Sequence, residues 1–266
     1  MMAREPVIPG DIPEESVPSL LRNWFLGSKA RRYLSRRRFV TVSGLAPRSR
    51  GGWSLDVGCG WGYNLFLMGE RGYRPVGIDI VQNDFTAASM IARANGRQAL
   101  LAGADVSALP FPDGLFEAVT AVETYEHIFH PDREGAVREV GRVMTPGGVF
   151  VLSTPNYHSV VEAGKRLIIG FPALRRLFPP MCYPAGEISR KDYHPYTYHR
   201  PSPEGEIKAL LEAQGFDVLE SKRIIFVWKS IPDLLFPAFI ALEFLLERIP
   251  FVRSLGSTLV IRSRRR

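Results

Sequence analysis

A glycine-rich turn between a buried strand and a helix constrains this chain more than any other feature. The turn, Gly58-Cys-Gly-Trp-Gly62, follows the apolar residues 53–57 and precedes the amphipathic residues 63–71. Glycine lacks the Cβ atom that would hold a ligand away from the backbone. The helix start just beyond the turn presents N–H groups that have no intrahelical partner. The sequence therefore predicts a ligand-binding turn after the first strand of an α/β domain.

Short apolar stretches alternate with longer amphipathic ones after residue 52, which predicts a mostly parallel sheet with helices on both faces. The expected strands are residues 53–57, 75–79, 98–101, 116–122, 149–153, 216–227 and 257–262. The expected helices are residues 63–71, 84–95, 132–144, 204–214 and 232–249, and Pro146-Gly-Gly148 is expected to separate the third of them from the next strand.

Two regions flank or interrupt this pattern. Residues 1–50 predict an N-terminal helical extension, with a helix over 20–45, and residues 51–266 form the expected main domain. Residues 156–203 break the alternation and are interpreted as an insertion after the fifth strand, of a length that is usually functional. The extension is basic, with no acidic residue between Glu15 and Asp56. Such a segment meets nucleic acid or anionic lipid in some proteins, but a solvated helix face is the favoured interpretation.

Composition excludes several protein classes. With 45% hydrophobic and 23% charged residues, the chain can bury a core and is not a disordered or collagen-like protein. Two cysteines cannot make a disulfide framework, and no Cys/His spacing indicates structural zinc.

We expect a cytoplasmic protein, since residues 1–10 carry no apolar signal-peptide core. The apolar residues 231–252 are interrupted by charges and prolines, so no membrane span is expected.

Two carboxylates indicate what the turn binds. Asp79 ends the second expected strand, where a carboxylate accepts hydrogen bonds from both hydroxyls of a ribose. The glycine spacing lacks the third glycine of the dinucleotide fingerprint. Asp56, just before the turn, would repel a pyrophosphate but accept from a cationic amino group. A nicotinamide-dependent oxidoreductase is therefore disfavoured, although it stays an alternative.

Four motifs, in order, resemble those of class I S-adenosylmethionine (SAM)-dependent methyltransferases, and the resemblance covers about residues 52–154. They are Asp56-Val-Gly-Cys-Gly-Trp-Gly62, Gly77-Ile-Asp79, Phe116-Glu-Ala-Val119 and Arg142-Val-Met-Thr-Pro-Gly-Gly148. The resemblance implies a Rossmann-like, seven-stranded, mostly parallel sheet whose last strand, about residues 258–261, is antiparallel. It also implies SAM as the methyl donor.

The same resemblance implies roles for individual residues. Asp56, Gly58 and Gly60 would hold the methionine end of SAM, and Asp79 would hold the ribose. Ile80 would flank the adenine, Asp105 would approach its amino group, and Val106 would offer it a backbone N–H. The expected cofactor-binding set also includes Glu123 and Cys59; Cys59 is interpreted as a packing residue rather than a nucleophile.

The stretch Glu123-Thr-Tyr-Glu-His127 follows the fourth strand, at the lip of the expected cleft. With Ser153-Thr-Pro-Asn156, it resembles the ubiquinone-biosynthesis O-methyltransferases. It is also similar to plant small-RNA 2′-O-methyltransferases, in which such residues hold a divalent cation. A metal site here would use Glu123, Glu126, His127 and His194. The alternatives are a metal-free site, with His127 or His194 as general base or orienting group beside Glu126, and a purely structural role.

The insertion is rich in aromatic residues, which suggests a lid over an apolar or ring-shaped acceptor. We therefore expect methyl transfer to an oxygen, in preference to a carbon or a nitrogen, of a small aromatic or lipid-like molecule. RNA as the acceptor and a non-catalytic SAM-binding subunit remain alternatives, and nucleic acid is the less favoured partner. Residues 165–178 and 234–249 mix apolar stretches with basic ends, so they are candidates to rest on the inner face of a membrane. A buried helix or a dimer contact would explain the second segment equally well.

Overall fold

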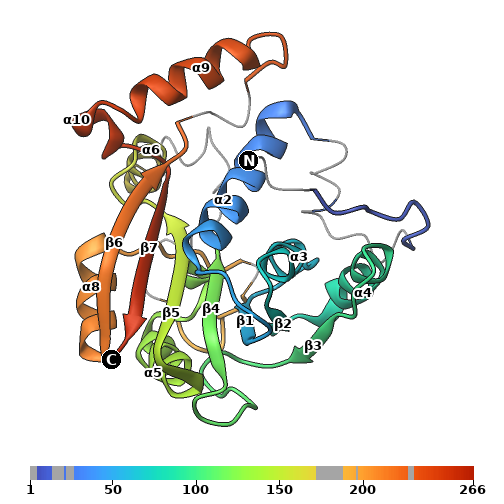
Figure 1. The fold of residues 1–266 in the computed structure, drawn as a ribbon. Coiled ribbons are helices and arrows are strands. Elements are labelled where there is room, and N and C mark those ends of the chain that lie inside the picture. Colours follow the sequence, from blue (N-terminus) through green and yellow to red (C-terminus); the bar gives the residue numbers. More distant parts are fainter. Residues whose placement is uncertain (1–4, 14–20, 22–26, 172–187, 196, 227–230) are drawn as a thin grey trace.

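A seven-stranded sheet organises the computed structural model, which describes residues 5–13, 21, 27–171, 188–195, 197–226 and 231–266 (Figure 1). The strand order is β3-β2-β1-β4-β5-β7-β6; the first five strands run parallel, and β7 runs antiparallel to both of its neighbours. This topology confirms the predicted Rossmann-like fold. The strands are β1 Trp53–Val57, β2 Arg74–Asp79, β3 Leu100–Gly103, β4 Phe116–Val122, β5 Met144–Pro155, β6 Phe216–Ile224 and β7 Thr258–Arg265.

Helices cover both faces of the sheet because side chains alternate along each strand. Phe150 and Leu152 of β5 pack in the same core as α5 and α8, whereas Val149 and Val151 pack with Val42 of α2. The helices are α2 Lys29–Leu45, α3 Tyr63–Glu70, α4 Phe85–Ala94, α5 Arg133–Val143, α6 Val160–Gly170, α8 Glu204–Ala213, α9 Phe236–Leu246 and α10 Pro250–Arg253. Among the described residues, no helix has both the length and the apolar character needed to cross a membrane.

Strand pairing moves two predicted boundaries. β3 starts at Leu100 rather than at residue 98 and extends to Gly103, since its partners in β2 run from Val76 to Asp79. The prediction that Pro146-Gly-Gly148 separates a helix from a strand is wrong, because these residues lie within β5. The pairing with β4 shifts between Phe116 and Ala118, so the strand accommodates the extra residues as a bulge.

The last third of the chain also departs from expectation. β6 ends at Ile224 because the next residue, Ile225, has a φ of 73°, a left-handed conformation that interrupts a strand. Position 227 of that predicted strand lies outside the described residues. The predicted helix over 232–249 is the shorter α9, followed by α10. β7 continues to Arg265, so the basic C-terminus belongs to the sheet, and Arg264 and Arg266 pair with Asp217.

The basic helix α2 crosses one face of the sheet (Figure 1) and is only partly a solvated face. It begins at Lys29, where the Ser28 side chain accepts a hydrogen bond from the Arg31 N–H. The sequence predicts a start at residue 20, but residues 20 and 22–26 of that prediction lie outside the described part of the chain. Three consecutive arginines are half-buried in ion pairs: Arg36 with Glu5, Arg37 with Glu247 and Arg38 with Glu123. The domain boundary at residue 50 stays a prediction.

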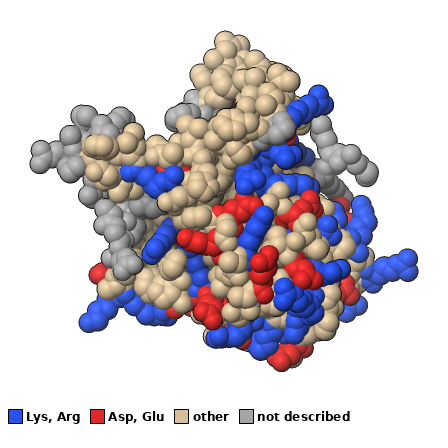
Figure 2. Space-filling view, turned by 90° about the vertical axis from the view of Figure 1, so that its left-hand side faces the viewer, with Lys and Arg blue, Asp and Glu red and all other residues tan. Residues whose placement is uncertain are grey.

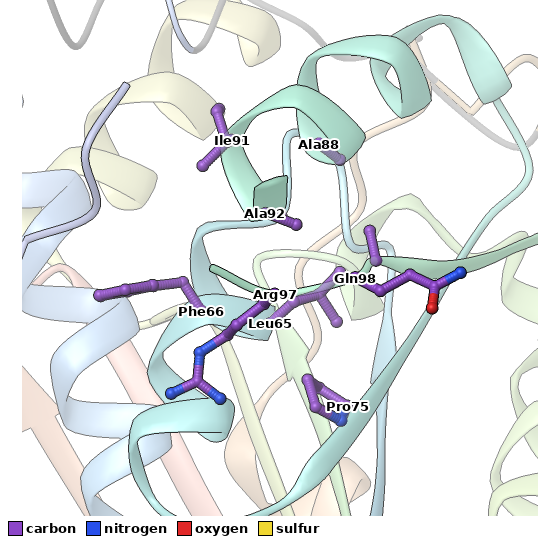
Figure 3. A pocket seen from close by; sticks show the side chains of 10 residues that line it. Leu65, Phe66, Pro75, Ala88, Ile91, Ala92, Arg97 and Gln98 are labelled. Carbon is purple, nitrogen blue, oxygen red and sulfur yellow. The ribbon is translucent and has the colours of Figure 1, made fainter. Parts of the chain in front are cut away.

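One pocket, of about 350 Å³ with its open solvent included, lies between α3, α4 and β2 (Figure 3). Its lining is mostly apolar, including Leu65, Pro75 and Ile91. The cationic side chain there, Arg97, is paired with Glu70 at 2.8 Å. This pocket therefore offers no group for catalysis and is not a candidate active site.

The antiparallel strand β7 generates a stability prediction. Ile261 is fully buried between β5 and β6, so Ile261→Ala should lower the free energy of unfolding by about 2–5 kcal/mol through lost burial and the cavity left behind. Urea unfolding followed by circular dichroism measures the change. Leu219→Ala on β6, an exposed site, serves as the control and should change stability by only about 0.5 kcal/mol. Equal effects at both sites would contradict the assigned register.

Candidate functional site

The glycine turn after β1 has the conformation that its residues predict. Gly58, Gly60 and Gly62 have φ values of 70°, 46° and 82°, a region that side chains disfavour. A Cβ atom on Gly58 would lie 2.4 Å from Oγ1 of Thr124, so the turn approaches the end of β4 closely. The backbone N–H groups of Gly58 and Cys59 donate to the carbonyl of Ile78, which fixes the turn against β2.

Asp79 at the end of β2 is held in one orientation. Its Oδ2 accepts a hydrogen bond from the Gly60 N–H at 3.1 Å, and its Oδ1 accepts one from the Val81 N–H at 3.0 Å. Each carboxylate oxygen has a further lone-pair direction, so the carboxylate can still accept from two ligand hydroxyls. Burial, followed by the charge of Asp79, raises the pKa of nearby Asp84 to about 6.

Asp56 lies beneath the turn rather than in its opening. The carboxylate is buried, and its Oδ1 accepts hydrogen bonds from Asn64 at 2.7 Å and Thr120 at 2.9 Å. Burial raises the pKa of Asp56 to about 7, although these two hydrogen bonds oppose the rise. A ligand cation nearby would offset the cost of this buried charge.

Cys59 has the character of a packing residue. Burial, with the charge of Asp56 second, raises the pKa of its thiol well above the usual value, so the reactive thiolate is disfavoured. Its Sγ would lie only 2.7 Å from a Cβ atom on Gly77, which shows how closely the turn packs on β2.

A cleft of about 500 Å³, open solvent included, lies at the carboxyl ends of β1, β2 and β4. Six predicted site residues line it: Gly58, Asp79, Ile80, Asp105, Val106 and His127. Other predicted site residues, including Asp56, Cys59, Gly60 and Glu123, are not among its lining residues. The sequence interpretation missed several lining residues: Thr124, Ile128, Phe129, Asp132 and Pro195. Tyr193 of the insertion lines the cleft, as the lid hypothesis expects, whereas Phe178, Tyr183 and Tyr196 lie outside the described residues.

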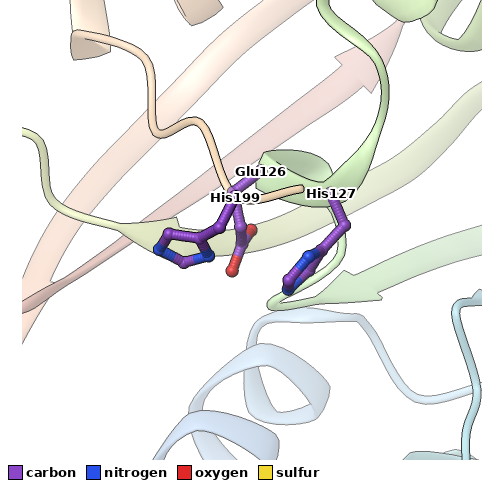
Figure 4. Close-up of side chains that lie close together, drawn as sticks. All are labelled: Glu126, His127 and His199. Carbon is purple, nitrogen blue, oxygen red and sulfur yellow. The ribbon is translucent and has the colours of Figure 1, made fainter. Parts of the chain in front are cut away.

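Beside the cleft, Glu126, His127 and His199 come together (Figure 4). One potential ligand atom of each lies within 4.8 Å of the others. Figure 4 shows the two imidazole rings on either side of the carboxylate, with their centroids 5.3 Å apart. A carboxylate with two imidazoles is a donor set that suits a transition metal or zinc ion.

Burial and one backbone carbonyl set the electrostatics of this group. The carbonyl of Tyr198 lies 2.6 Å from Nδ1 of His127 and can only accept, so Nδ1 carries a proton and, in the neutral tautomer, Nε2 has the lone pair. Burial lowers the pKa of His199 to about 3, so this ring is neutral near pH 7. Burial, followed by the charge of Glu123, raises the pKa of Glu126 well above its usual value. Among the described residues, Oε2 of Glu126 has no hydrogen-bond partner.

Arg133 of α5 builds this group by joining two distant segments. Its guanidinium is buried and stacks over the Tyr125 ring at 4.5 Å. Its N–H groups donate to the carbonyls of Ile128 and Arg200 and to the Ser202 hydroxyl. The Arg200 N–H in turn donates to the Glu126 carbonyl at 2.9 Å. The chain returning from the insertion is therefore fixed against the loop after β4, which places His199 beside Glu126.

Two predicted metal ligands lie outside the group. His194 is exposed, and its place is taken by His199, five residues further along the same segment. Glu123 accepts a hydrogen bond from Ser153 at 3.0 Å and lies 3.3 Å from Arg38 of α2. The sequence did contain the histidine, but it offered no spacing by which to choose between residues 194 and 199.

Comparisons with known proteins agree with this geometry. A methyltransferase domain family matches residues 55–152. Demethylmenaquinone methyltransferase from Thermus thermophilus is 31% identical over 173 residues, which cover 62% of this chain and 74% of the relative. Ubiquinone biosynthesis O-methyltransferase from Psychrobacter cryohalolentis is 37% identical over 138 residues, or 50% of this chain and 51% of the relative. Several other curated relatives are likewise spanned over about half their length or less.

Solved structures agree on the fold. A SAM-dependent methyltransferase from Methanosarcina mazei superposes with a TM-score of 0.58 at 19% identity, covering 82% of this chain and 93% of the other. The sheet order, the glycine turn and the Thermus relative lead to the same conclusion, and the nicotinamide alternative is not retained: the chain belongs to the SAM-dependent methyltransferases.

Proposed function

We propose that this protein transfers the methyl group of SAM to an oxygen of a small aromatic or lipid-like acceptor. The observation that carries the proposal is that His127, a candidate base, lines the same cleft as Asp79, the candidate ribose ligand. Because the methyl group of a sulfonium is already activated, the protein has to align the acceptor with it and remove a proton.

The donor would be held by the turn and its neighbours. Asp79 accepts from the ribose hydroxyls with the lone pairs that its backbone bonds leave, while Ile80, Asp105 and Val106 surround the adenine. Asp56 and the turn glycines hold the methionine end. The buried Asp56 carboxylate stabilises the donor's amino cation, which in turn compensates a charge that burial disfavours.

The acceptor hydroxyl would lie near Nε2 of His127. The hydrogen bond between Nδ1 and the Tyr198 carbonyl keeps the ring in the tautomer whose Nε2 accepts a proton. The Tyr193 hydroxyl donates to the His127 carbonyl at 2.9 Å, which fixes the backbone of the base as well. His127 can therefore remove the acceptor proton as the methyl group is transferred.

Glu126, His127 and His199 also fit a divalent metal, since one potential ligand atom of each lies within 4.8 Å of the others and the His199 ring is neutral near pH 7. Such an ion, when bound, supplies a positive charge that lowers the pKa of a nearby hydroxyl. Arg133 positions the three side chains in either case by fixing the segment that carries His199.

The comparisons favour a small acceptor over the alternatives. Relatives named for ubiquinone, demethylmenaquinone and phytyl-hydroquinone methylation support a quinone-like or other lipid-like molecule. Against RNA, Arg36, Arg37 and Arg38 of the basic helix are engaged in ion pairs. Against a non-catalytic subunit, the cleft opens to solvent and brings His127, a candidate base, beside Asp79.

Asp79→Asn tests the donor site. The substitution keeps the shape of the side chain but removes its charge, and hydrogen bonds to a charged group contribute about 1.5–3 kcal/mol, so SAM affinity should fall by about tenfold to a hundredfold. Isothermal titration calorimetry measures the affinity. Glu70→Gln, in a surface pair with Arg97, is the matched control. Unchanged SAM affinity in Asp79→Asn would refute the ribose assignment.

His127→Ala tests the acceptor chemistry. With a soluble catechol or hydroquinone as acceptor and SAM labelled in its methyl group, the loss of a general base should lower kcat by about a hundredfold or more. SAM affinity should change little. His158→Ala, at an exposed histidine, is the control. Full turnover in His127→Ala would remove this residue from the mechanism.

A metal titration tests the ligand set directly. Mn²⁺ binding, followed by calorimetry in the absence of SAM, should be lost in Glu126→Gln and in His199→Ala. His194→Ala, in the same segment but outside the group, should bind as the parent protein does. If His194→Ala weakens binding and His199→Ala does not, the ligand set proposed above is wrong. If the parent protein binds no Mn²⁺, the metal proposal fails and the metal-free base remains.

A further inference from the structure

Helix α9 turns its acidic side chains toward the protein. Glu243 is fully buried, and its carboxylate accepts hydrogen bonds from the Tyr33 hydroxyl at 2.9 Å and from the Phe226 N–H at 3.3 Å. One turn further, Glu247 pairs with Arg37 at 2.6 Å. Tyr33 and Arg37 both belong to α2, so α2 holds the polar side of α9.

The exposed side chains of the same segment are mostly apolar, although the Phe244 ring also contacts Arg37 at 5.4 Å. Phe251 is 79% exposed and Leu234 is 89% exposed. The exposure of such apolar side chains to water is unfavourable in free energy. The exposed apolar residues, which we call the α9 apolar surface, are Leu234, Leu235, Phe239, Leu242, Phe244, Leu245, Ile249 and Phe251. This arrangement is the reverse of an ordinary surface helix, whose charged side faces water. Exposed apolar patches of this kind mark interaction sites.

Cations border the α9 apolar surface. Arg248 and Arg253 are exposed on the segment itself, and Lys29 is exposed where α2 begins. The backbone N–H of Lys29 donates to the exposed Asp233, which joins the start of α2 to the approach of α9. In Figure 2, tan side chains cover the top of the molecule, the level at which α9 and α10 lie in Figure 1, and blue side chains lie at their edge. The surface therefore combines apolar side chains with positive charge.

We propose that the α9 apolar surface docks on an anionic lipid bilayer. Apolar side chains would enter the boundary between headgroups and acyl chains while the bordering cations meet anionic headgroups. α9 has 11 residues and is about 16 Å long, roughly half the hydrocarbon thickness, so the helix would lie in the membrane plane rather than cross it. A second copy of the chain would cover the apolar side chains but would bring the same cations together.

Docking would bring the membrane near the acceptor end of the cleft. Arg37 holds α9, and the next residue of α2, Arg38, lies 3.3 Å from Glu123 at the end of β4. α6 extends this side of the molecule: the Asn156 side chain, just before α6, donates to the carbonyls of Ser254 and Gly256, just after α10. A lipid-like acceptor could thus pass from the bilayer to the cleft. This last step rests on the proposed function, whereas the docking itself does not.

Vesicle flotation of the full chain tests the proposal. The protein should bind vesicles that contain phosphatidylglycerol and bind vesicles of phosphatidylcholine alone more weakly. Phe244→Glu combined with Phe251→Glu should lower the partition coefficient by about tenfold or more, because two apolar side chains are replaced by anions. Leu219→Glu, exposed on β6, is the matched control and should bind as the parent does. Should the double variant fail to fold, Leu234→Glu provides the same test.

A second pair of variants tests the charge. Arg248→Glu with Arg253→Glu should remove the preference for phosphatidylglycerol, whereas Arg138→Glu, exposed on α5, should keep it. Vesicle binding that is absent in the parent, or unchanged in the Phe variants, overturns the proposal. So does a dimer in analytical ultracentrifugation that the same Phe variants dissociate, since the occupant is then a second copy.

The readouts separate this proposal from the proposed function. The Phe variants should keep SAM affinity and methyl transfer to a soluble acceptor. Intact transfer without vesicle binding by the parent overturns the docking alone, whereas vesicle binding without transfer to any acceptor overturns the proposed function alone.

Discussion

The group formed by Glu126, His127 and His199 depends on the buried guanidinium of Arg133. Two chain segments about seventy residues apart meet there, and no strand pairing among the described residues aligns one with the other. Carbonyl oxygens of Ile128 and Arg200, the Ser202 hydroxyl and the Tyr125 ring compensate the buried charge. Without this charge the carbonyls would lose donors in a buried place, and the bond from the Arg200 N–H to the Glu126 carbonyl would hold the His199 segment with less support.

Helix α2 plays the corresponding role on the other side of the sheet. Its apolar residue Val42 packs on β5 and β7, while Tyr33 and Arg37 hold the two carboxylates of α9. Arg38 reaches Glu123 beside the cleft. One helix thus joins the sheet, the exposed apolar segment and the acceptor end of the site. The ion pairs of α2 are half-buried, so they are less screened by salt than surface pairs and fix how these parts are arranged.

What could be predicted from the sequence depended on how local the determinants are. The glycine turn, Asp79 and the alternation of strands with helices follow from residues close together in the chain, and the family resemblance supplied the seven-stranded sheet with its antiparallel last strand. The pairing of β5 with β4 through a bulge could not be foreseen, since Pro146-Gly-Gly148 is typical of a break rather than of a strand. His199 was missed for a related reason: its position is set by the Arg200 and Glu126 backbones, which no spacing in the sequence reveals. The sequence could not decide which side of α9 faces the protein, or whether the segment contacts a membrane or is buried. The reason is that its partners Tyr33 and Arg37 lie more than two hundred residues away.

The proposed donor and acceptor halves of the site are built differently. In the proposed donor half, backbone groups of one turn and a carboxylate at the end of the next strand would hold SAM, whatever the acceptor. The family match, residues 55–152, contains this half together with Glu126 and His127, but His199, Arg200 and α9 lie beyond it. In the matched half, chemistry fixes the geometry, because every methyl transfer from SAM presents the same nucleoside. In the remainder, Arg133 holds the segment that carries His199, and α2 holds α9. The proposals for the acceptor and for the membrane surface therefore rest in part on His199 and α9, which lie outside the matched residues.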